Sequence, residues 1–340
     1  MRRYAGEGLP VGCRIAVVAN DALGNYVVST PLLQMLRERW NPSVLHYYSG
    51  TRTEELWAED PKIDWGFCLH GNEPHFTVLN AFVETGSQPY DLVINLENTA
   101  WPKSFTAVVA ALNTYVCGPC TGADGRGDLP FEQDPRGKLW ADKDWISANL
   151  PLKYSFLQTG FIGEIFCRLA YLDGPIPPYD LPSHDVTIEI PDVIISTAAS
   201  LTEKLWPIEK WAEIIQRLKT QNVTVGLVGA KPTAQSRFWK GAVEEDQLVE
   251  RRLVKDLRGA FSLPSVVGVL AKAKTVLTID NGILHLAVAA NAPTVGLYRY
   301  GIHRLWAPPY PNLEVLTPEE DQPVSEISVD TVWEALQRAL

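Results

Sequence analysis

Short runs of valine, isoleucine and leucine, each followed by an amphipathic stretch, are the feature that most restricts the fold of this chain. The runs lie at residues 14–20, 44–49, 91–96, 114–118, 193–197, 223–229, 275–280 and 294–298. A strand that is apolar along its whole length is buried on both faces, as in a parallel sheet covered by helices. The pattern therefore predicts an α/β fold with two doubly wound, Rossmann-like parallel sheets.

A proline-rich segment separates the two halves of this pattern. Residues 174–182 contain four prolines, too many for a helix or a central strand. We expect an N-terminal domain at residues 1–174, a C-terminal domain at residues 175–325 and a terminal helix at residues 326–340. Ligands of such sheets bind at the carboxyl ends of the strands, so we also expect a ligand cleft between the two domains.

The overall charge and hydropathy exclude several classes of protein. The formal net charge of −10 argues against a general nucleic-acid-binding protein. No stretch approaches the roughly 20 apolar residues that a membrane-spanning helix needs, and no leader peptide is recognisable. We therefore expect a cytoplasmic protein with at most peripheral contact at the inner face of the membrane.

The five cysteines do not form a recognisable framework. Their odd number and scattered spacing do not suggest disulfides, although Cys117 and Cys120 form a CxxC pair. No second ligand pair stands at a zinc-binding spacing, and no HxH, HExxH or DxD motif lies near the predicted strand ends. We interpret the pair as two ordinary thiols at a strand end and predict no metal and no cofactor.

The first junction between a strand and a helix, at residues 20–31, contains Asp21, Gly24 and Asn25. A glycine after a strand lets a ligand approach the backbone, and the following helix N-terminus favours an anion or a developing negative charge. The alternative interpretation is a simple turn in which Asp21 caps the helix.

Two junctions in the second half carry hydroxyl groups, lysines and glycine. Residues 196–207 begin with small hydroxyl residues, including Thr197 and Ser200, and continue to Lys204. Hydroxyls can hold phosphate oxygens, and a lysine can neutralise a diphosphate leaving group. The run at 223–229 ends on Gly229, where a nucleoside can lie. The alternative is a surface loop with solvated lysines.

The junction at residues 278–287 is the clearest indication of a ligand site in the sequence. Asp280 ends the predicted strand, Gly282 permits close approach, and His285 lies one turn into the next helix. Such a cluster can hold a diphosphate and sugar hydroxyls. The alternative interpretation of His285 is a satisfied core histidine beneath the loop.

Taken together, these junctions resemble glycosyltransferase family 9, the lipopolysaccharide heptosyltransferase family, over roughly residues 14–318. Residues 22–33 look like the family's Gly-Asp loop and helix, 200–207 like its donor-phosphate loop, and 280–285 like its Asp-[Ser/Thr]-Gly-x-x-His motif. The resemblance implies a GT-B fold of two facing Rossmann-like domains with an interdomain cleft. It also implies inverting, metal-independent transfer from a nucleotide-diphosphate sugar, typically ADP-heptose.

The resemblance also assigns roles to individual residues. Ser200 and Lys204 would contact the diphosphate, and Phe261 falls where the family lines its base pocket. Gly24 and Glu97 would face the acceptor. The complete expected donor site is Thr197, Ser200, Lys204, Gly229, Thr233, Phe261, Asp280, Asn281, Gly282 and His285.

Two residues depart from the family pattern. Asn25 stands where the family usually has an aspartate as candidate base, and an amide cannot accept a proton usefully near neutral pH. The base would then be displaced to Asp21 or Glu97, or the reaction would be weak or absent. Thr233 stands where the family often has an acidic residue near the ribose, so the nucleotide is left open.

The sequence therefore predicts an inverting glycosyltransferase that moves a heptose or related sugar from a nucleotide-diphosphate donor, expected to be ADP-linked. The acceptor would be a glycan, a lipopolysaccharide core or another lipid-linked molecule, or a small molecule. The alternative is a catalytically silent nucleotide-sugar-binding protein on the same fold. A sugar epimerase of similar architecture fits the first junction poorly.

Overall fold

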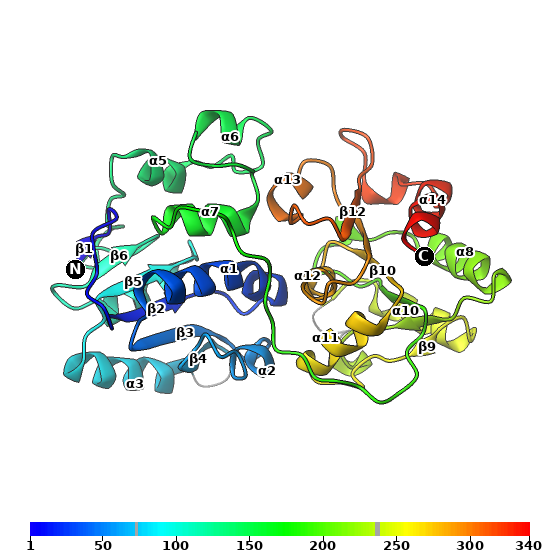
Figure 1. Cartoon of the computed structure of the whole chain (residues 1–340), viewed down its shortest axis with the longest axis horizontal. Helices are drawn as coiled ribbons and strands as arrows, with labels where there is room; N and C mark the ends of the chain where they lie inside the picture. Colours follow the sequence, from blue (N-terminus) through cyan, green and yellow to red (C-terminus); the bar gives the residue numbers. More distant parts are fainter. Residues whose placement is uncertain (72–73, 235–238) are drawn as a thin grey trace. The chain divides into compact units, whose positions relative to one another are not determined.

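The structure is a computed structural model that describes residues 1–71, 74–234 and 239–340. The chain divides into two compact units, Met1–Asp180 and Leu181–Leu340. Figure 1 shows the chain from its N-terminus in blue to its C-terminus in red. The boundary expected after residue 174, and the acceptor and donor roles expected for the two units, stay predictions.

The N-terminal unit is built on a six-stranded sheet in the order β1-β6-β5-β2-β3-β4, and every pair in it is parallel. Its strands are β1 (Arg2–Arg3), β2 (Arg14–Val18), β3 (Val44–Gly50), β4 (Trp65–His70), β5 (Leu92–Asn95) and β6 (Tyr115–Cys117). Strands β2 and β5 are buried along almost their whole length, as their uninterrupted apolar sequences predict.

The helices of this unit are α1 (Leu23–Trp40), α2 (Glu54–Trp57), α3 (Pro74–Ser87), α4 (Ala100–Val109), α5 (Pro135–Ala141), α6 (Leu150–Lys153) and α7 (Ile162–Leu169). Helix α1 follows β2 directly and packs against α7, while α3 packs against α4. The N-terminus of α1 therefore lies at the carboxyl edge of the sheet, next to the ends of β2 and β5.

The C-terminal unit repeats this architecture. Its parallel sheet has the order β12-β11-β10-β7-β8-β9. The strands are β7 (Val193–Ser196), β8 (Val225–Leu227), β9 (Lys255–Asp256), β10 (Thr275–Ile279), β11 (Thr294–Leu297) and β12 (Leu313–Leu316). The helices include η1 (Thr202–Lys204), α8 (Ile208–Thr220), α10 (Ala242–Glu250), α11 (Leu263–Lys272), α12 (Gly282–Ala289), α13 (His303–Trp306), η2 (Val324–Glu326) and α14 (Val329–Ala339). The prediction of two doubly wound parallel sheets is confirmed.

The short helices α5 and α7 lie in the segment after β6. In residues 154–172 the helix is limited to α7, because the Glu164 carboxylate accepts the backbone N–H groups of Gln158 and Thr159 at 2.8 and 2.6 Å and holds a turn there. The stretch at residues 119–150, rich in glycine, aspartate and proline, contains α5, which is capped by Asp134 through a 2.7 Å bond from the Gly137 N–H.

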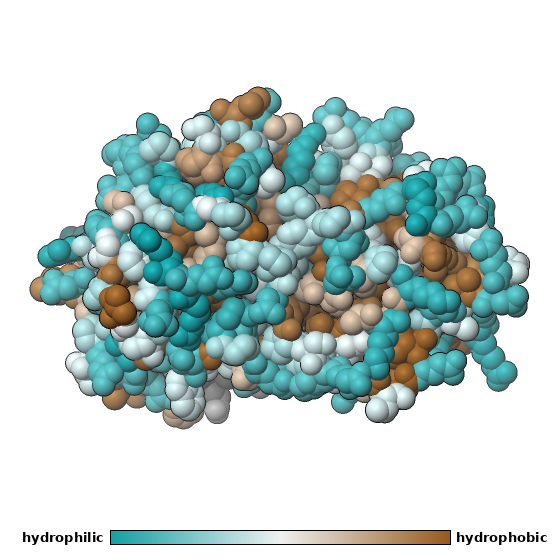
Figure 2. Space-filling model, in the orientation of Figure 1, coloured by the Kyte–Doolittle hydropathy of each residue, from teal (hydrophilic) through white to brown (hydrophobic). Residues whose placement is uncertain are grey.

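In the part of the chain that the structure describes, none of the helices is long and apolar enough to cross a bilayer. On the face drawn in Figure 2, hydrophilic residues cover most of the surface and apolar residues form small separate groups.

Candidate functional site

The carboxyl edge of the C-terminal sheet carries an ion pair between Lys204 and Asp280. The Lys204 Nζ lies 2.7 Å from the Asp280 Oδ2 and also donates to the Asp280 carbonyl oxygen at 3.2 Å. Asp280 directly follows β10 and is nearly buried, whereas Lys204 ends η1 and is partly exposed. The aspartate therefore fixes the lysine ammonium beside the N-terminus of α12, where an anion is favoured.

Asn281 is the N-cap of α12, and internal hydrogen bonds occupy its side chain. Its Oδ1 accepts the N–H groups of Ile283 and Leu284 at 3.0 and 3.2 Å. Its Nδ2 donates to Ser196 Oγ and to the Ala198 carbonyl, each at 3.1 Å. Asn281 therefore joins the end of β7 to the start of α12, and this positions the backbone around Gly282.

His285 lies close enough to the Lys204–Asp280 pair for both charges to act on its ring. Its side chain is buried, and it meets the Trp306 ring edge-on with 6.3 Å between ring centroids. Burial lowers the pKa of His285 to about 4, with a small opposing effect from Asp280. The histidine is therefore neutral near pH 7, which fits its interpretation as a core histidine beneath the loop. It nevertheless belongs to the same cluster as the ion pair.

The loop after β7 holds Thr197 and Ser200 in different environments. Thr197 is buried and donates to the Glu245 Oε1 at 2.7 Å, whereas Ser200 is exposed. Burial raises the pKa of Glu245 to about 7, although Arg258 lies 3.6 Å away. The Thr197 hydroxyl is thus committed to Glu245, and Ser200 is the accessible hydroxyl of this loop.

The remaining expected donor residues lie at the ends of neighbouring strands. Gly229 follows β8 and accepts a 2.8 Å hydrogen bond from the Gly259 N–H, which joins the loops after β8 and β9. Phe261 is half-buried just before Ser262, the N-cap of α11, and Thr233 is exposed. The structure therefore brings Lys204, Asp280, Asn281, Gly282 and His285 into one cluster and leaves Gly229, Thr233 and Phe261 along the same sheet edge.

The carboxyl edge of the N-terminal sheet places Asn25 beside Glu97. The Asn25 Nδ2 donates to the Glu97 Oε1 across a long 3.5 Å hydrogen bond. Burial raises the pKa of the half-buried Glu97, while hydrogen bonds from the side chains of Asn20 and Asn25 partly oppose this effect. The carboxylate is thus surrounded mainly by neutral amides.

Asn95, at the end of β5, fixes the backbone on which Glu97 stands. Its Oδ1 accepts the Glu97 N–H at 2.9 Å, and its Nδ2 donates to the carbonyls of Glu97 and Pro119 at 2.9 and 2.7 Å. Gly118 allows this close packing: its φ is +89°, and a Cβ there would lie 2.0 Å from the Asn95 carbonyl oxygen.

Asp21 has a different partner. Both of its carboxylate oxygens pair with the Arg52 guanidinium, through a 2.9 Å bond from Nε and a second bond from Nη2. Its side chain makes no cap hydrogen bond to α1, so the capping alternative is wrong, and Gly24 lies in the first turn of that helix.

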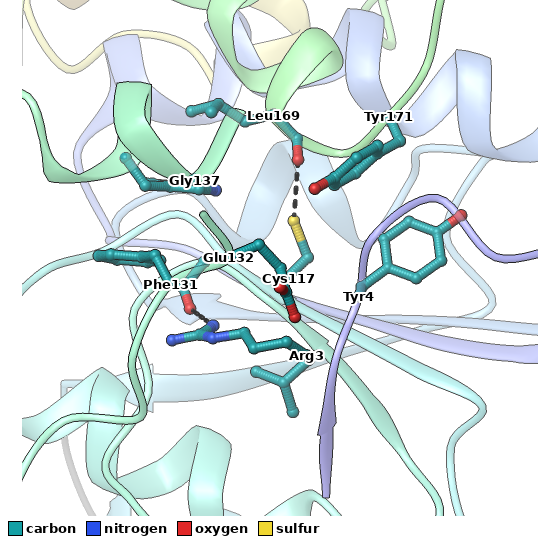
Figure 3. A pocket seen from close by; sticks show the side chains of 11 residues that line it. Arg3, Tyr4, Cys117, Phe131, Glu132, Gly137, Leu169 and Tyr171 are labelled. Carbon is teal, nitrogen blue, oxygen red and sulfur yellow. Dashed lines mark hydrogen bonds between the residues drawn. The ribbon is translucent and has the colours of Figure 1, made fainter. Parts of the chain in front are cut away.

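Cys117 and Cys120 are free and buried. Burial raises their pKa values to about 12 and 11. Figure 3 shows Cys117 donating to the Leu169 carbonyl, at 3.2 Å, beside Arg3, Tyr4 and Tyr171. The cavity there measures about 10 Å³, room for one water rather than a sugar or nucleotide. The two cysteines are thus unpaired, buried thiols near the end of β6, and their interpretation as ordinary thiols stays a prediction.

A larger cavity of about 270 Å³ lies beside α8. Thr197, Trp206, Trp211 and Glu244 are among the residues that line it, and Lys204 and Asp280 are not. Across the described residues, no three His, Cys, Asp or Glu side chains are placed to share a metal ion. The expectation that the reaction needs no metal stays a prediction.

Sequence reasoning missed Asn20, Asn95, Arg52 and Glu245. Asn20 and Asn95 stand at the ends of predicted strands, and that position is the signal that could have identified them. Arg52 lies 31 residues from its partner Asp21, and Glu245 lies 48 residues from Thr197, so only the fold shows their roles.

Comparison with known sequences gives one family. Residues 180–329 match the model of glycosyltransferase family 9 (heptosyltransferase). A lipopolysaccharide heptosyltransferase 1 from Salmonella typhimurium is 29% identical over 172 residues, 46% of this chain and 52% of the relative. A lipooligosaccharide heptosyltransferase 2 from Haemophilus influenzae is 32% identical over 96 residues, 28% and 27% of the two chains. The matched regions thus span about half or less of these curated relatives.

Comparison with solved structures covers nearly the whole chain. A family 9 glycosyl transferase from Veillonella parvula superposes with a TM-score of 0.74 at 16% identity, covering 98% of both chains. An E. coli heptosyltransferase with ADP-2-deoxy-2-fluoro heptose superposes with a TM-score of 0.64 at 16% identity, over 96% of this chain and 100% of the other. These similarities confirm the GT-B class of fold for the whole length.

Proposed function

Because this chain is a distant member of glycosyltransferase family 9, we propose that it transfers a heptose or a related sugar from an ADP-linked donor to an acceptor hydroxyl. The C-terminal unit binds the donor, since it contains the part of the chain that matches the family. The N-terminal unit binds the acceptor, a glycan, lipopolysaccharide core or small molecule, and supplies the proton-accepting carboxylate. Transfer inverts the anomeric centre and uses no metal.

The observation that carries this proposal is the Lys204–Asp280 pair beside the start of α12. Asp280 holds the ammonium in place before the donor binds, so little side-chain entropy is lost on binding. When the glycosidic bond breaks, negative charge develops on the diphosphate, and Lys204 with the backbone N–H groups near Gly282 stabilises it. The exposed hydroxyl of Ser200 adds a hydrogen bond to a phosphate oxygen.

The direct test is isothermal titration of the full chain with ADP, GDP, UDP, dTDP and ADP-heptose. We expect selective binding of the adenine nucleotides. We further expect ADP release from ADP-heptose only when an acceptor, such as a heptose-free lipopolysaccharide core fragment, is present.

Two results would change the proposal. Binding of ADP-heptose without ADP release would favour the silent binding protein, and conversion of the donor sugar with no acceptor would favour an epimerase. Lack of binding to every nucleotide would overturn the donor site itself.

A further inference from the structure

The proposed reaction needs a group that accepts the proton of the acceptor hydroxyl, and Asn25 at the start of α1 cannot do so. Two carboxylates, Asp21 and Glu97, lie at the same carboxyl edge of the N-terminal sheet. Their surroundings differ, and the difference identifies one of them.

Asp21 is poorly suited to proton transfer. Both of its oxygens face the Arg52 guanidinium. The guanidinium occupies both oxygens, so neither is available to accept a proton from an acceptor hydroxyl. Asp21 therefore orders the loop after β2 and contributes negative charge next to Glu97.

Glu97 has the opposite environment. Its backbone is fixed on both sides by Asn95, and its carboxylate meets the amide of Asn25 at 3.5 Å while one side of the residue stays open to solvent. Within the described residues, no cation forms an ion pair with it. The geometry points to Glu97 as the catalytic base of the transfer, with Asn25 as the residue that positions it. This inference rests on the proposed function.

The step balances without a further reactant. The acceptor oxygen forms a bond to the anomeric carbon, and the bond from that carbon to the diphosphate oxygen breaks, leaving its electron pair on the diphosphate. The acceptor proton moves to Glu97. Burial raises the pKa of Glu97, which makes the carboxylate a stronger proton acceptor near neutral pH than an exposed glutamate.

Other titratable and charged groups around Glu97 are Asp21 with its partner Arg52, and Tyr47 on β3. Beyond Asp21 lies His70 at the end of β4, whose pKa is lowered by burial. Burial raises the pKa of Tyr47 well above its ordinary value, so it stays neutral. Of the two carboxylates in this cluster, Asp21 is paired with a cation, whereas Glu97 is surrounded by neutral amides.

The test is the isosteric variant Glu97→Gln, measured as ADP release from ADP-heptose with the core-fragment acceptor. We expect kcat to fall about 10²- to 10⁴-fold, the usual contribution of a general base, while the Kd for ADP is unchanged. The matched control is Glu84→Gln on α3, a glutamate paired with Arg14, which should keep full turnover.

A second variant tests the positioning role. Asn25→Ala removes a donor that lowers the pKa of Glu97, so that pKa rises and the acidic limb of the kcat/KM profile moves to higher pH. If Asn25 were only a structural residue, Asn25→Ala would lower kcat/KM without moving the acidic limb of the profile.

The outcomes separate the two proposals. If Glu97→Gln keeps at least a tenth of wild-type kcat, or if Asp21→Asn alone abolishes turnover, Glu97 is not the base although the transferase function stands. If the wild-type chain binds ADP-heptose and releases no ADP with the acceptor, the proposed function fails and the base assignment fails with it. An Asn25→Ala profile with an unmoved acidic limb would remove the positioning role even if Glu97→Gln did not fold.

Discussion

The carboxyl edges of the two sheets carry polar clusters of different construction. In the C-terminal unit, fixed opposite charges meet, with Lys204 held by Asp280 at 2.7 Å. In the N-terminal unit, the carboxylate of Glu97 is surrounded by the amides of Asn20 and Asn25. A fixed cation suits the binding of a diphosphate, whose charge changes little on binding. Neutral amides suit a carboxylate that must gain and lose a proton. They orient it by hydrogen bonds but favour its ionised form less strongly than a cation would.

The comparison implies that a substitution at one sheet edge should leave the binding or catalytic role of the other edge unchanged. Gly118→Ala should have the largest effect of the variants considered. A methyl group there would meet the Asn95 carbonyl oxygen at 2.0 Å in a left-handed backbone, so we expect a loss of about 3 kcal/mol in the free energy of unfolding. Urea unfolding measures this. Because Asn95 holds Glu97, turnover should also fall while ADP affinity stays unchanged.

Gly125→Ala is the matched control for Gly118→Ala. Gly125 also has a left-handed φ, +69°, but no atom lies within 4 Å of its added methyl group. We expect the cost of the backbone conformation alone, about 1–2 kcal/mol. Equal losses for both variants would show that the contact with Asn95 contributes nothing.

Lys204→Ala tests the other edge. Loss of one charge-assisted contact, worth about 1.5–3 kcal/mol, should weaken ADP binding roughly 10- to 100-fold, as measured by isothermal titration. The control Lys219→Ala removes the same charge from an exposed lysine that donates to the Arg252 carbonyl. If both variants bind ADP as tightly as the wild type, the donor site has been assigned to the wrong residues.

Asn281→Ala should have the smallest effect of the three. It removes the N-cap of α12, which typically stabilises by about 1 kcal/mol. Ser328→Ala removes the N-cap of α14 and should cost a similar amount of stability in thermal unfolding. Only Asn281→Ala should also weaken ADP binding, because the Asn281 cap positions the backbone near Gly282. If Asn281→Ala lowers stability but leaves ADP affinity unchanged, Asn281 serves only as a helix cap.

Periodicity predicted the central strands well, because β2, β5, β7 and β10 are buried on both faces and their apolar sequences are uninterrupted. It missed the strands at the sheet edges, β1, β4, β9 and β12. Of these, β1 and β9 have only two residues each, and both consist of charged residues, Arg2–Arg3 and Lys255–Asp256. Pairing with the neighbouring strand, rather than composition, makes these two segments strands.

The candidate site was predictable where one strand end carries several polar residues, as at Asp280, Asn281 and Gly282. It was not predictable where partners are distant in sequence. Neither the pairing of Asp21 with Arg52 nor that of Thr197 with Glu245 has a local signal. These pairings nevertheless decide which side chains are open to a ligand, so the motifs predicted polar clusters at the strand ends but not the partners of each side chain.

The start of the proline-rich segment is anchored to the N-terminal unit. Arg168 donates to the Leu172 and Gly174 carbonyls at 2.8 and 2.7 Å, and the nearly buried Lys62 ammonium reaches the Asp180 carboxylate at 2.9 Å. Tyr26, the neighbour of Asn25, donates to Asp60, which also binds Lys62. This network determines where a crossover should lie when C-terminal halves are exchanged between relatives, whether by natural recombination or in the laboratory. A splice after Asp180 keeps the network whole, whereas one at residue 174 leaves Lys62 with a single carboxylate and loosens the helix that carries Asn25.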